Sequence, residues 1–347
     1  MSAAQSSENK ARLAWVDYAR GLCIILVVMM HSTLGVEAAA GAEGWLHYVV
    51  AFAKPFRIPA FFLISGLLFA HVADRDRRSF IDSKILHFAY FYMLWLTIQF
   101  AFRAPAGIAS QGVAQQVHDY FLAFIDPFGP LWFIYMLPVF YVVTRLARPL
   151  PAPVVFVAAA LLEMAHVQTG WTLIDEFCAR FVYFYSGTLF ATFIFARGSA
   201  LPARKGATLA LLVLWAATTA LAVALGWSEW PGVSLALGFM GASGILAIGV
   251  LLADGSWLQA VLAIGRNTLP VYVAFTIPMA ITRTALLKTG VISDIGTVSL
   301  LVTIVALIVP LMLAWLVRGT RFAFLFERPD WCRLTPAFKA RTAVANS

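Results

Sequence analysis

Two polar side chains, Arg20 and His31, stand eleven positions apart in the first apolar segment of the chain, ARGLCIILVVMMHSTLG. In an α-helix this spacing corresponds to about 16 Å along the axis and brings both residues to nearly the same face. The helix would then carry a guanidinium at one end and an imidazole in its other half. An uncharged imidazole can remove a proton from a hydroxyl as a general base, or attack a carbonyl carbon as a nucleophile.

A third candidate, Arg57, lies near the start of the next apolar segment, KPFRIPAFFLISG. Because the second segment runs in the opposite direction to the first, we expect Arg57 at a depth similar to that of His31, where the two side chains can meet. Pro59 removes a backbone hydrogen bond and Gly66 permits close approach, so this helix is expected to be bent or tightly packed. His31 and Arg57 together form a candidate site in the outer half of the membrane.

Each of these residues also has a purely structural interpretation. A lone histidine in a membrane helix can serve only to hydrogen-bond a neighbour, and an arginine at a helix entrance often does no more than fix topology. Arg57, beside a proline near an interface, can extend its guanidinium to the headgroups. Residue type and spacing alone leave both interpretations open.

The composition predicts the elements that position these residues. Hydrophobic residues make up 61% and charged residues 12% of the 347 positions, whereas soluble proteins contain about 25% charged residues. An apolar helix needs about 20 residues to cross the hydrocarbon core. The chain is therefore predicted to be an all-α, polytopic membrane helix bundle with about ten transmembrane helices and no separate soluble domain. The ten candidate spans are 19–36, 49–70, 84–102, 130–147, 151–168, 178–196, 206–225, 231–252, 258–280 and 297–317.

Basic residues flank these spans unevenly. With the loops assigned alternately to two sides, 19 of the 25 Lys and Arg residues fall on the N-terminal side, and the positive-inside rule then places both termini in the cytoplasm. The expected organisation is a cytoplasmic segment 1–18, a transmembrane domain 19–317 and a cytoplasmic tail 318–347. The tail begins with RGTRFAFLFERPDW, which is suited to anchoring at the interface. The alternate assignment of loops to the two sides requires the short segment 151–168 to cross the membrane, because without it every later loop would change sides.

The first segment has a competing interpretation as a secretory signal. Lys10 and Arg12 precede the apolar run, and EAAAG at 37–41 resembles a small-residue cleavage site. The run is longer than a usual signal core of about 7–15 residues and contains His31. These two features favour a retained membrane helix.

Two other classes of function are disfavoured. The net charge of +8 comes from basic residues that flank apolar segments, where they act as topology signals, so nucleic-acid binding is not expected. Cys23, Cys178 and Cys332 lie far apart and form no CxxC or Cys/His cluster, so we expect neither a disulfide framework nor a metal site.

Aromatic and basic residues in two later motifs are further candidates. Trp132 and Tyr135 in GPLWFIYML fall at the outer boundary, where they can contact a substrate or simply belong to an aromatic belt. Arg266 and Asn267 in IGRNTLPVY fall at a cytoplasmic helix start. There a cation and backbone N–H groups can receive a phosphate, although a plain helix cap explains them equally well.

Two more regions leave their roles open. Glu163 and His166 lie three positions apart on one helical face, as a proton-handling pair or as polar contacts between helices. The longest outward loop, 103–129, contains HDYFLAFIDPFGP, which can lie along the membrane interface or help to form a lid.

Taken together, these segments resemble the acyltransferase 3 family of integral membrane acyltransferases. RLAWVDYARGLCIILVVMMHS at 12–32 is similar to its first-helix signature, and FRIPAFFLISGLLF at 56–69 is similar to its second-helix motif. PLWFIYMLP, RFVYFYSGTLFA, GRNTLPVYV and LFERP follow in the expected order. In one departure, Phe275 stands where the family commonly has a histidine, so an auxiliary role for that histidine does not carry over.

The resemblance implies transfer of an acyl group, often acetyl, from cytoplasmic acyl-CoA to a hydroxyl of an exported or cell-envelope carbohydrate. The protein would be a multi-pass protein of the bacterial inner membrane. His31 is then the residue closest to the chemistry, and Arg57 stabilises the developing oxyanion or holds the acceptor. Asp17, about 21 Å from His31 along the helix, is expected to pair with Arg20 or to cap the helix start.

The remaining site residues fall into two groups. The residues expected to bind the phosphates of CoA at the cytoplasmic side are Arg20 and Arg266. The residues expected to contact the substrate are Trp132, Tyr135 and Tyr272.

Two other classes of function compete with an acyltransferase. A transporter or flippase for a lipid-linked or small polar solute would use the same buried His and Arg residues as a proton relay or as a substrate site. The sequence shows no repeated halves and no corresponding pair of interrupted helices, which speaks against it. A non-catalytic scaffold or sensor would require His31 to be dispensable.

Overall fold

The computed structural model describes residues 3–255 and 257–334, and within them the side chains of 3–13, 199–200 and 202–203 are not described. Parts of the predicted end segments 1–18 and 318–347 therefore lie outside the described residues. The side chains of Lys10 and Arg12, which enter the charge and signal arguments, lie outside them as well.

The described residues form helices and turns, with no β-strand among them, so the predicted all-α class is confirmed. The α-helices are α1 (Ala3–Ala40), α2 (Leu46–Ala53), α3 (Arg57–Ala70), α4 (Arg77–Phe80), α5 (His87–Gln111), α6 (Val113–Leu122), α7 (Trp132–Leu146), α8 (Ala152–Met164), α9 (Thr172–Leu189), α10 (Ala191–Ala200), α11 (Lys205–Ala224), α12 (Val233–Gly255), α13 (Gln259–Arg266), α14 (Thr268–Ala274), α15 (Thr276–Thr289) and α16 (Ile295–Val317). The π-helical turn is η1 (Ile81–Leu86), and the 3-10 turns are η2 (Gly129–Leu131), η3 (Leu201–Arg204), η4 (Trp227–Glu229), η5 (Ala323–Leu325) and η6 (Asp330–Cys332).

Among the described residues, six helices are long and apolar enough to cross a membrane, and the number rises to nine if each of three bent helix pairs is one span. The bent pairs are α2 with α3, α9 with α10, and α14 with α15. The protein is thus a multi-pass membrane protein, but the expected count of ten is not confirmed. The segment predicted at 151–168 holds only α8, whose 13 residues extend about 20 Å, short of the hydrocarbon thickness.

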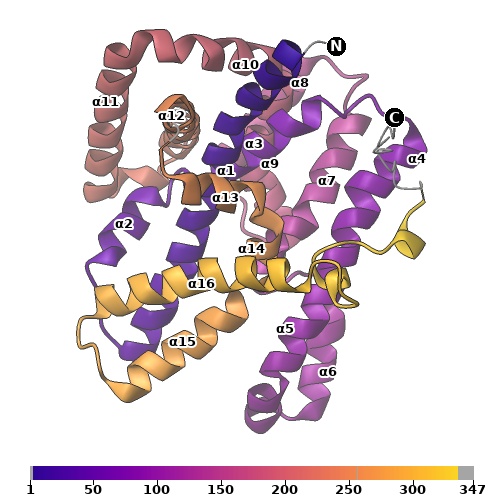
Figure 1. Cartoon of the computed structure of the whole chain (residues 1–347), viewed down its shortest axis with the longest axis vertical. Helices are drawn as coiled ribbons and strands as arrows, with labels where there is room; N and C mark the ends of the chain where they lie inside the picture. Colours follow the sequence, from indigo (N-terminus) through magenta and orange to yellow (C-terminus); the bar gives the residue numbers. More distant parts are fainter. Residues whose placement is uncertain (1–2, 256, 335–347) are drawn as a thin grey trace, which may run out of the picture.

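Two predicted boundaries change. The span expected at 258–280 contains the separate short helix α13, and the bent pair that can cross the membrane runs from Thr268 to Thr289. The expected outward loop 103–129 is largely helical, because α5 continues to Gln111 and α6 follows after Gly112, whose φ of 86° allows the sharp reversal. The α5–α6 hairpin projects from one end of the bundle (Figure 1).

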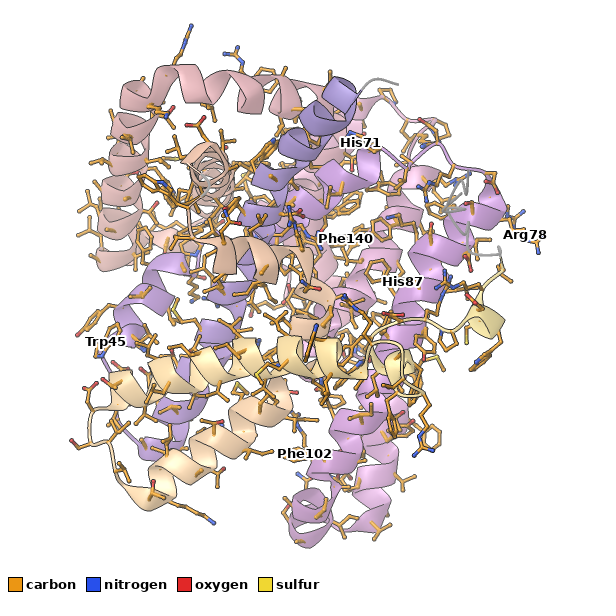
Figure 2. The ribbon with its side chains drawn as sticks, viewed as in Figure 1. Trp45, His71, Arg78, His87, Phe102 and Phe140 are labelled. Atoms are coloured by element: carbon orange, nitrogen blue, oxygen red, sulfur yellow. The ribbon has the colours of Figure 1, made fainter. Side chains whose placement is uncertain are left out.

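Helix α1 lies inside the bundle and contacts α3, α12, α13, α14, α15 and α16 (Figure 1). Side chains such as Phe140 are buried between the helices, whereas Arg78 on α4 is exposed at the edge (Figure 2). Since α1 has helices on several sides, polar groups along it face protein as well as lipid. This is the setting in which membrane-embedded charges are tolerated.

Glycines set the closest helix crossings. A Cβ on Gly66 of α3 would collide with the carbonyl oxygen of Phe184 on α9, and a Cβ on Gly187 would collide with the carbonyl oxygen of Leu63. Thr188 donates a hydrogen bond to the carbonyl oxygen of Gly66 across the same crossing, at 3.1 Å. The close packing predicted for Gly66 is confirmed, and it fixes α9 against α3.

The break between α2 and α3 places Arg57. The two helices meet at 49° across Lys54, Pro55 and Phe56, so the bend precedes the helix that carries Arg57 at its first position. Pro59 falls in the first turn of α3, where its missing N–H would have no intrahelical partner. Pro59 therefore does not bend α3, and the bend belongs to the segment that contains Pro55.

Candidate functional site

A cavity of about 190 Å³ lies where α1 meets the N-terminal parts of α3, α7 and α9 and the middle of α14. We call it the His31 cavity. Four residues singled out from the sequence line it: His31, Arg57, Trp132 and Tyr272. Its other lining residues are Val27, Met30, Ile58, Phe61, Pro130, Phe133, Glu176 and Arg180. The imidazole and the second-helix arginine, which the sequence predicts to lie close together, therefore line the same cavity.

The imidazole of His31 is half-buried and makes no hydrogen bond to any residue that the structure describes. Its ring lies against the ring of Phe275, with 5.5 Å between the centroids. Phe275 is fully buried at the break between α14 and α15, and as a hydrocarbon ring it can neither donate to the imidazole nor accept from it. The side chain of His31 is packed on one side and keeps its hydrogen-bonding capacity for another group.

Arg57 likewise has unmet hydrogen-bonding capacity. One terminal nitrogen, Nη1, donates to the carbonyl oxygen of Val50 at 3.3 Å, while Nε is buried without a hydrogen-bond partner. No carboxylate among the described residues forms an ion pair with Arg57. A guanidinium carries five N–H donors, so most of its donors stay available. The positive charge of Arg57 is not neutralised within the cavity.

Glu176 and Arg180 are cavity residues that the sequence did not single out. They lie one turn apart on α9, and Arg180 Nε donates to Glu176 Oε2 at 3.2 Å. Charges spaced i, i+4 usually just stabilise a helix. The sequence feature that could have identified Glu176 and Arg180 as site residues is their position near the start of an apolar membrane helix, where charge is costly unless it faces protein or water.

The three aromatic residues predicted to contact the substrate do not all lie at the His31 cavity. Trp132 and Tyr272 line the cavity, whereas Tyr135 does not. The ring of Tyr135 lies 5.1 Å from that of Tyr92, and its hydroxyl donates to the carbonyl oxygen of Phe124 at 3.3 Å. Tyr135 thus holds α7 against the segment after α6, and the structure does not bring it to His31.

The other end of α1 carries a second polar group, which we call the Asp17 cluster: Asp17, Arg20, Arg266 and Thr268. Arg20 donates to Asp17 Oδ1 at 3.4 Å and to the hydroxyl of Thr268 at 2.5 Å. Arg266 Nε lies 3.6 Å from Asp17 Oδ2. The predicted pairing of Asp17 with Arg20 is confirmed. The two arginines expected to bind phosphate are brought together by one carboxylate.

A tight crossing of α1 and α13 positions this cluster. A Cβ on Gly265 would collide with the carbonyl oxygen of Asp17, and a Cβ on Gly21 with the carbonyl oxygen of Val261. Asn267, which precedes α14, donates its side chain back to the carbonyl oxygen of Ala263 and does not cap α14. The cluster therefore rests on side chains and not on a helix terminus.

Glu163 and His166 bond to different partners. The hydroxyl of Tyr183 donates to Glu163 Oε1 at 3.1 Å, and His166 Nε2 lies 3.2 Å from the hydroxyl of Ser234. These contacts join α8 to α9 and to α12. Of the two interpretations left open, the structure favours polar contacts between helices, away from the His31 cavity.

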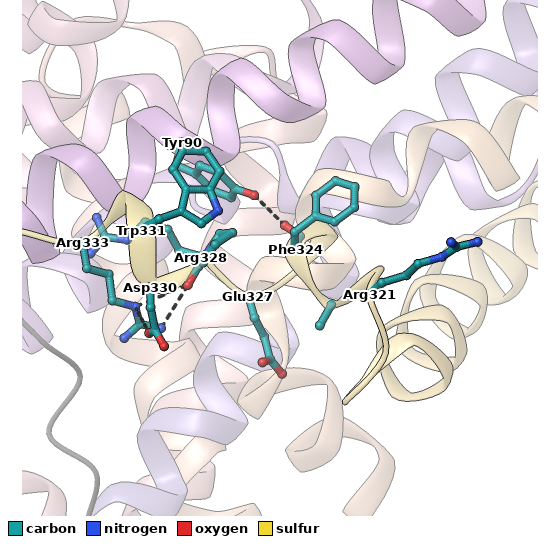
Figure 3. A pocket seen from close by; sticks show the side chains of 10 residues that line it. Tyr90, Arg321, Phe324, Glu327, Arg328, Asp330, Trp331 and Arg333 are labelled. Carbon is teal, nitrogen blue, oxygen red and sulfur yellow. Dashed lines mark hydrogen bonds and ion pairs between the residues drawn. The ribbon is translucent and has the colours of Figure 1, made fainter.

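A separate cavity of about 500 Å³ lies under the C-terminal segment, beside Tyr90 of α5 (Figure 3). Two of its arginines already have carboxylate partners, since Arg328 bonds Asp82 at 2.8 Å and Arg333 bonds Asp330 at 3.3 Å. The hydroxyl of Tyr90 donates to the carbonyl oxygen of Phe324 at 2.9 Å (Figure 3). These contacts attach the tail to η1 and to the start of α5.

Fold and cavity together define a polytopic membrane protein with a polar, partly unsatisfied site inside its helix bundle. A family model described as an acyltransferase domain, Acyl_transf_3, matches residues 13–319. The chain belongs to the acyltransferase 3 family.

One curated relative is the inner membrane protein YcfT of Escherichia coli strain K12, which is 25% identical over 228 residues. The match covers 59% of this chain and 63% of YcfT, so the chain spans less than two thirds of that relative. No solved structure matches the chain.

Proposed function

We propose that the protein transfers an acyl group, most simply acetyl, from cytoplasmic acyl-CoA to a hydroxyl of an exported or cell-envelope carbohydrate, in the inner membrane of a bacterium. Family membership supports the group-transfer chemistry, and the similarity to an inner membrane protein supports the location. The observation that carries the proposal is the His31 cavity. It holds an imidazole without a hydrogen bond to a described residue beside an arginine with a buried, unpartnered Nε.

His31 can act by two balanced routes. As a general base it takes the proton of the acceptor hydroxyl while the oxygen attacks the thioester carbonyl; the C–S bond then breaks and the departing thiolate takes that proton. As a nucleophile it forms the N–C bond itself, the thiolate leaves with the proton of the second ring nitrogen, and the acceptor hydroxyl later takes the acyl group and returns a proton. Both routes need an uncharged imidazole in contact with the thioester or the acceptor.

Arg57 supplies the positive charge that either route requires. Negative charge develops on the carbonyl oxygen in each tetrahedral transition state, and a fixed donor at that point is worth about 3 kcal/mol. Arg57 fits this role because no carboxylate among the described residues neutralises it. Arg180 is less suited, since Glu176 already pairs with it.

The Asp17 cluster suits the donor. Arg266 has 59% of its side chain exposed and Arg20 has 27%. Each keeps N–H donors beyond those used on Asp17 and Thr268. Two guanidinium groups held beside one carboxylate leave a net positive charge, which favours the phosphates of CoA. The distance of about 16 Å along α1 to His31 would then be bridged by the extended pantetheine arm.

The test uses inverted membrane vesicles that contain the protein, supplied with radiolabelled acetyl-CoA on their outer, cytoplasmic face. We expect label on a carbohydrate with the wild-type protein and none with His31→Ala. His71→Ala is the matched control, because His71 lies at the far end of α3 and contacts Phe195. If the wild type labels no carbohydrate and His31→Ala still supports uptake of a solute, the protein is a transporter and the proposal is wrong.

A further inference from the structure

A second cavity, of about 740 Å³, adjoins the His31 cavity on the side of the α5–α6 hairpin. We call it the vestibule. Trp132 lines both cavities. The chain also passes from one cavity to the other at two places. Gly129 lines the vestibule and the next residue, Pro130, lines the His31 cavity. On α9, Thr172 lines the vestibule and Glu176, one turn later, lines the His31 cavity. The two spaces therefore meet at Trp132.

One face of the extended α5 forms a wall of the vestibule. Phe100, Arg103, Gly107 and Ser110 recur at intervals of three or four residues, so they lie along a single stripe of the helix. A Cβ on Gly107 would collide with the side-chain amide of Gln116 on α6. The glycine thus lets the polar side of α6 approach the wall.

Helix α6 is amphipathic, and its two faces have different surroundings. Gln116 and Asp119 line the vestibule, whereas Val113, Val117 and Phe121 are each more than half exposed on another face. In a membrane protein an exposed apolar stripe of this kind lies against the lipid. The hairpin therefore contacts the membrane with one face and closes a polar space with the other.

The vestibule offers polar groups with capacity for a ligand. The guanidinium of Arg103 lies over the ring of Phe128 at 5.4 Å and makes no ion pair with a described carboxylate. Asp119 Oδ1 accepts from Gln115 at 2.6 Å and lies 3.3 Å from Nδ1 of His118, and no ion pair joins Asp119 to an arginine or lysine among the described residues. A cation, two carboxylates, an amide and two hydroxyls around an indole ring suit a ligand with many hydroxyl groups and an apolar ring face.

We propose that the vestibule binds the carbohydrate chain of the acceptor, with Trp132 at the junction packing against the sugar ring that enters the His31 cavity. This inference rests on the proposed acyltransferase function and adds the location and class of the acceptor subsite. A volume of about 740 Å³ falls within the range of pockets for drug-sized ligands, which suits a short oligosaccharide segment, whereas the His31 cavity is much smaller. The acceptor is thus a sugar within a chain and not a free small alcohol.

Two variants test the vestibule in the same vesicle assay, by a polar change and by a steric block. Asp119→Asn keeps the shape and removes the charge. Ser110→Trp fills the space from the α5 wall. Thr284→Trp is the matched steric control, since Thr284 is an exposed helical hydroxyl on α15 that lines neither cavity. Lys288→Gln is the charge control on the same helix.

The rate of label transfer to carbohydrate is divided by the amount of protein that binds acetyl-CoA, because this ratio does not depend on how much of a variant folds. We expect the ratio to fall about tenfold or more in Asp119→Asn and Ser110→Trp, with the KM for acetyl-CoA unchanged, and to stay at the wild-type value in both controls. Ratios at the control value in both vestibule variants, or an increase in the KM for acetyl-CoA alone, would overturn the acceptor subsite and leave the acyltransferase proposal standing. A wild-type protein that releases no CoA and labels no carbohydrate would overturn the proposed function itself, and the subsite with it.

Discussion

The two polar regions along α1 differ in how their charges are balanced. In the Asp17 cluster, one carboxylate lies between two guanidinium groups, and Arg20 also bonds Thr268. In the His31 cavity, the imidazole and most of the Arg57 donors have no partner among the described residues. A cluster whose charged groups pair with each other is stable without a ligand. When a ligand binds, some of these groups can exchange a bond within the cluster for a bond to the ligand. A cavity with unmet bonds inside a membrane protein carries a cost that a reacting ligand can offset.

The largest effect in this comparison should come from Arg57. Arg57→Gln removes the unneutralised charge, and we expect kcat to fall about 10²- to 10³-fold at saturating acetyl-CoA, because the oxyanion loses its donor. Arg57→Lys should recover part of the loss, since it restores the charge without the planar group. Arg148→Gln, whose arginine pairs with the exposed Asp74, is the control. A kcat for Arg57→Gln within threefold of wild type would remove Arg57 from the chemistry.

A smaller effect of a different kind is expected at the other end of α1. Arg20→Ala and Arg266→Ala should each raise the KM for acetyl-CoA about tenfold, the effect of one lost charge-assisted hydrogen bond, and change kcat little. Initial rates at varied acetyl-CoA give both constants. An unchanged KM in both variants would show that the Asp17 cluster only packs α1 against α13 and α14.

The smallest effect is expected at Phe275. Phe275→Leu keeps an apolar wall against His31, and a small reduction in core volume of this kind costs about 0.5–1.5 kcal/mol. We expect kcat within about threefold of wild type across the pH range in which the protein is stable. A loss of tenfold or more in kcat would mean that the aromatic ring orients the imidazole. The imidazole of His31 would then have a fixed partner, as the charged groups of the Asp17 cluster do.

Local signals in the sequence predicted part of this picture. Arg20 and His31 share one uninterrupted helix, so helical periodicity was enough to relate them. Arg57 and His31 line one cavity because the second helix pair returns antiparallel, and Gly66 packs closely because it lacks a side chain. Each of these inferences needed only hydropathy, polarity and the spacing of nearby residues.

Other features depend on where the helices end in space. Glu176 and Arg180 look like an ordinary i, i+4 pair until the start of α9 is placed beside α3 and α7. The vestibule exists only because α5 continues as a helix past its apolar part and α6 folds back on it. Tyr135 is one turn from the residues that line the His31 cavity, and the rotation of α7 turns it toward Tyr92. Hydropathy carries no information about such rotations.

We propose that His31 performs the reaction while the Asp17 cluster binds the donor. The most direct test measures acetyl-CoA binding and carbohydrate labelling on the same preparation of His31→Ala protein. We expect a Kd for acetyl-CoA within about twofold of wild type, together with a loss of labelling of at least about a hundredfold. Labelling that persists in His31→Ala, at a normal Kd, would contradict it.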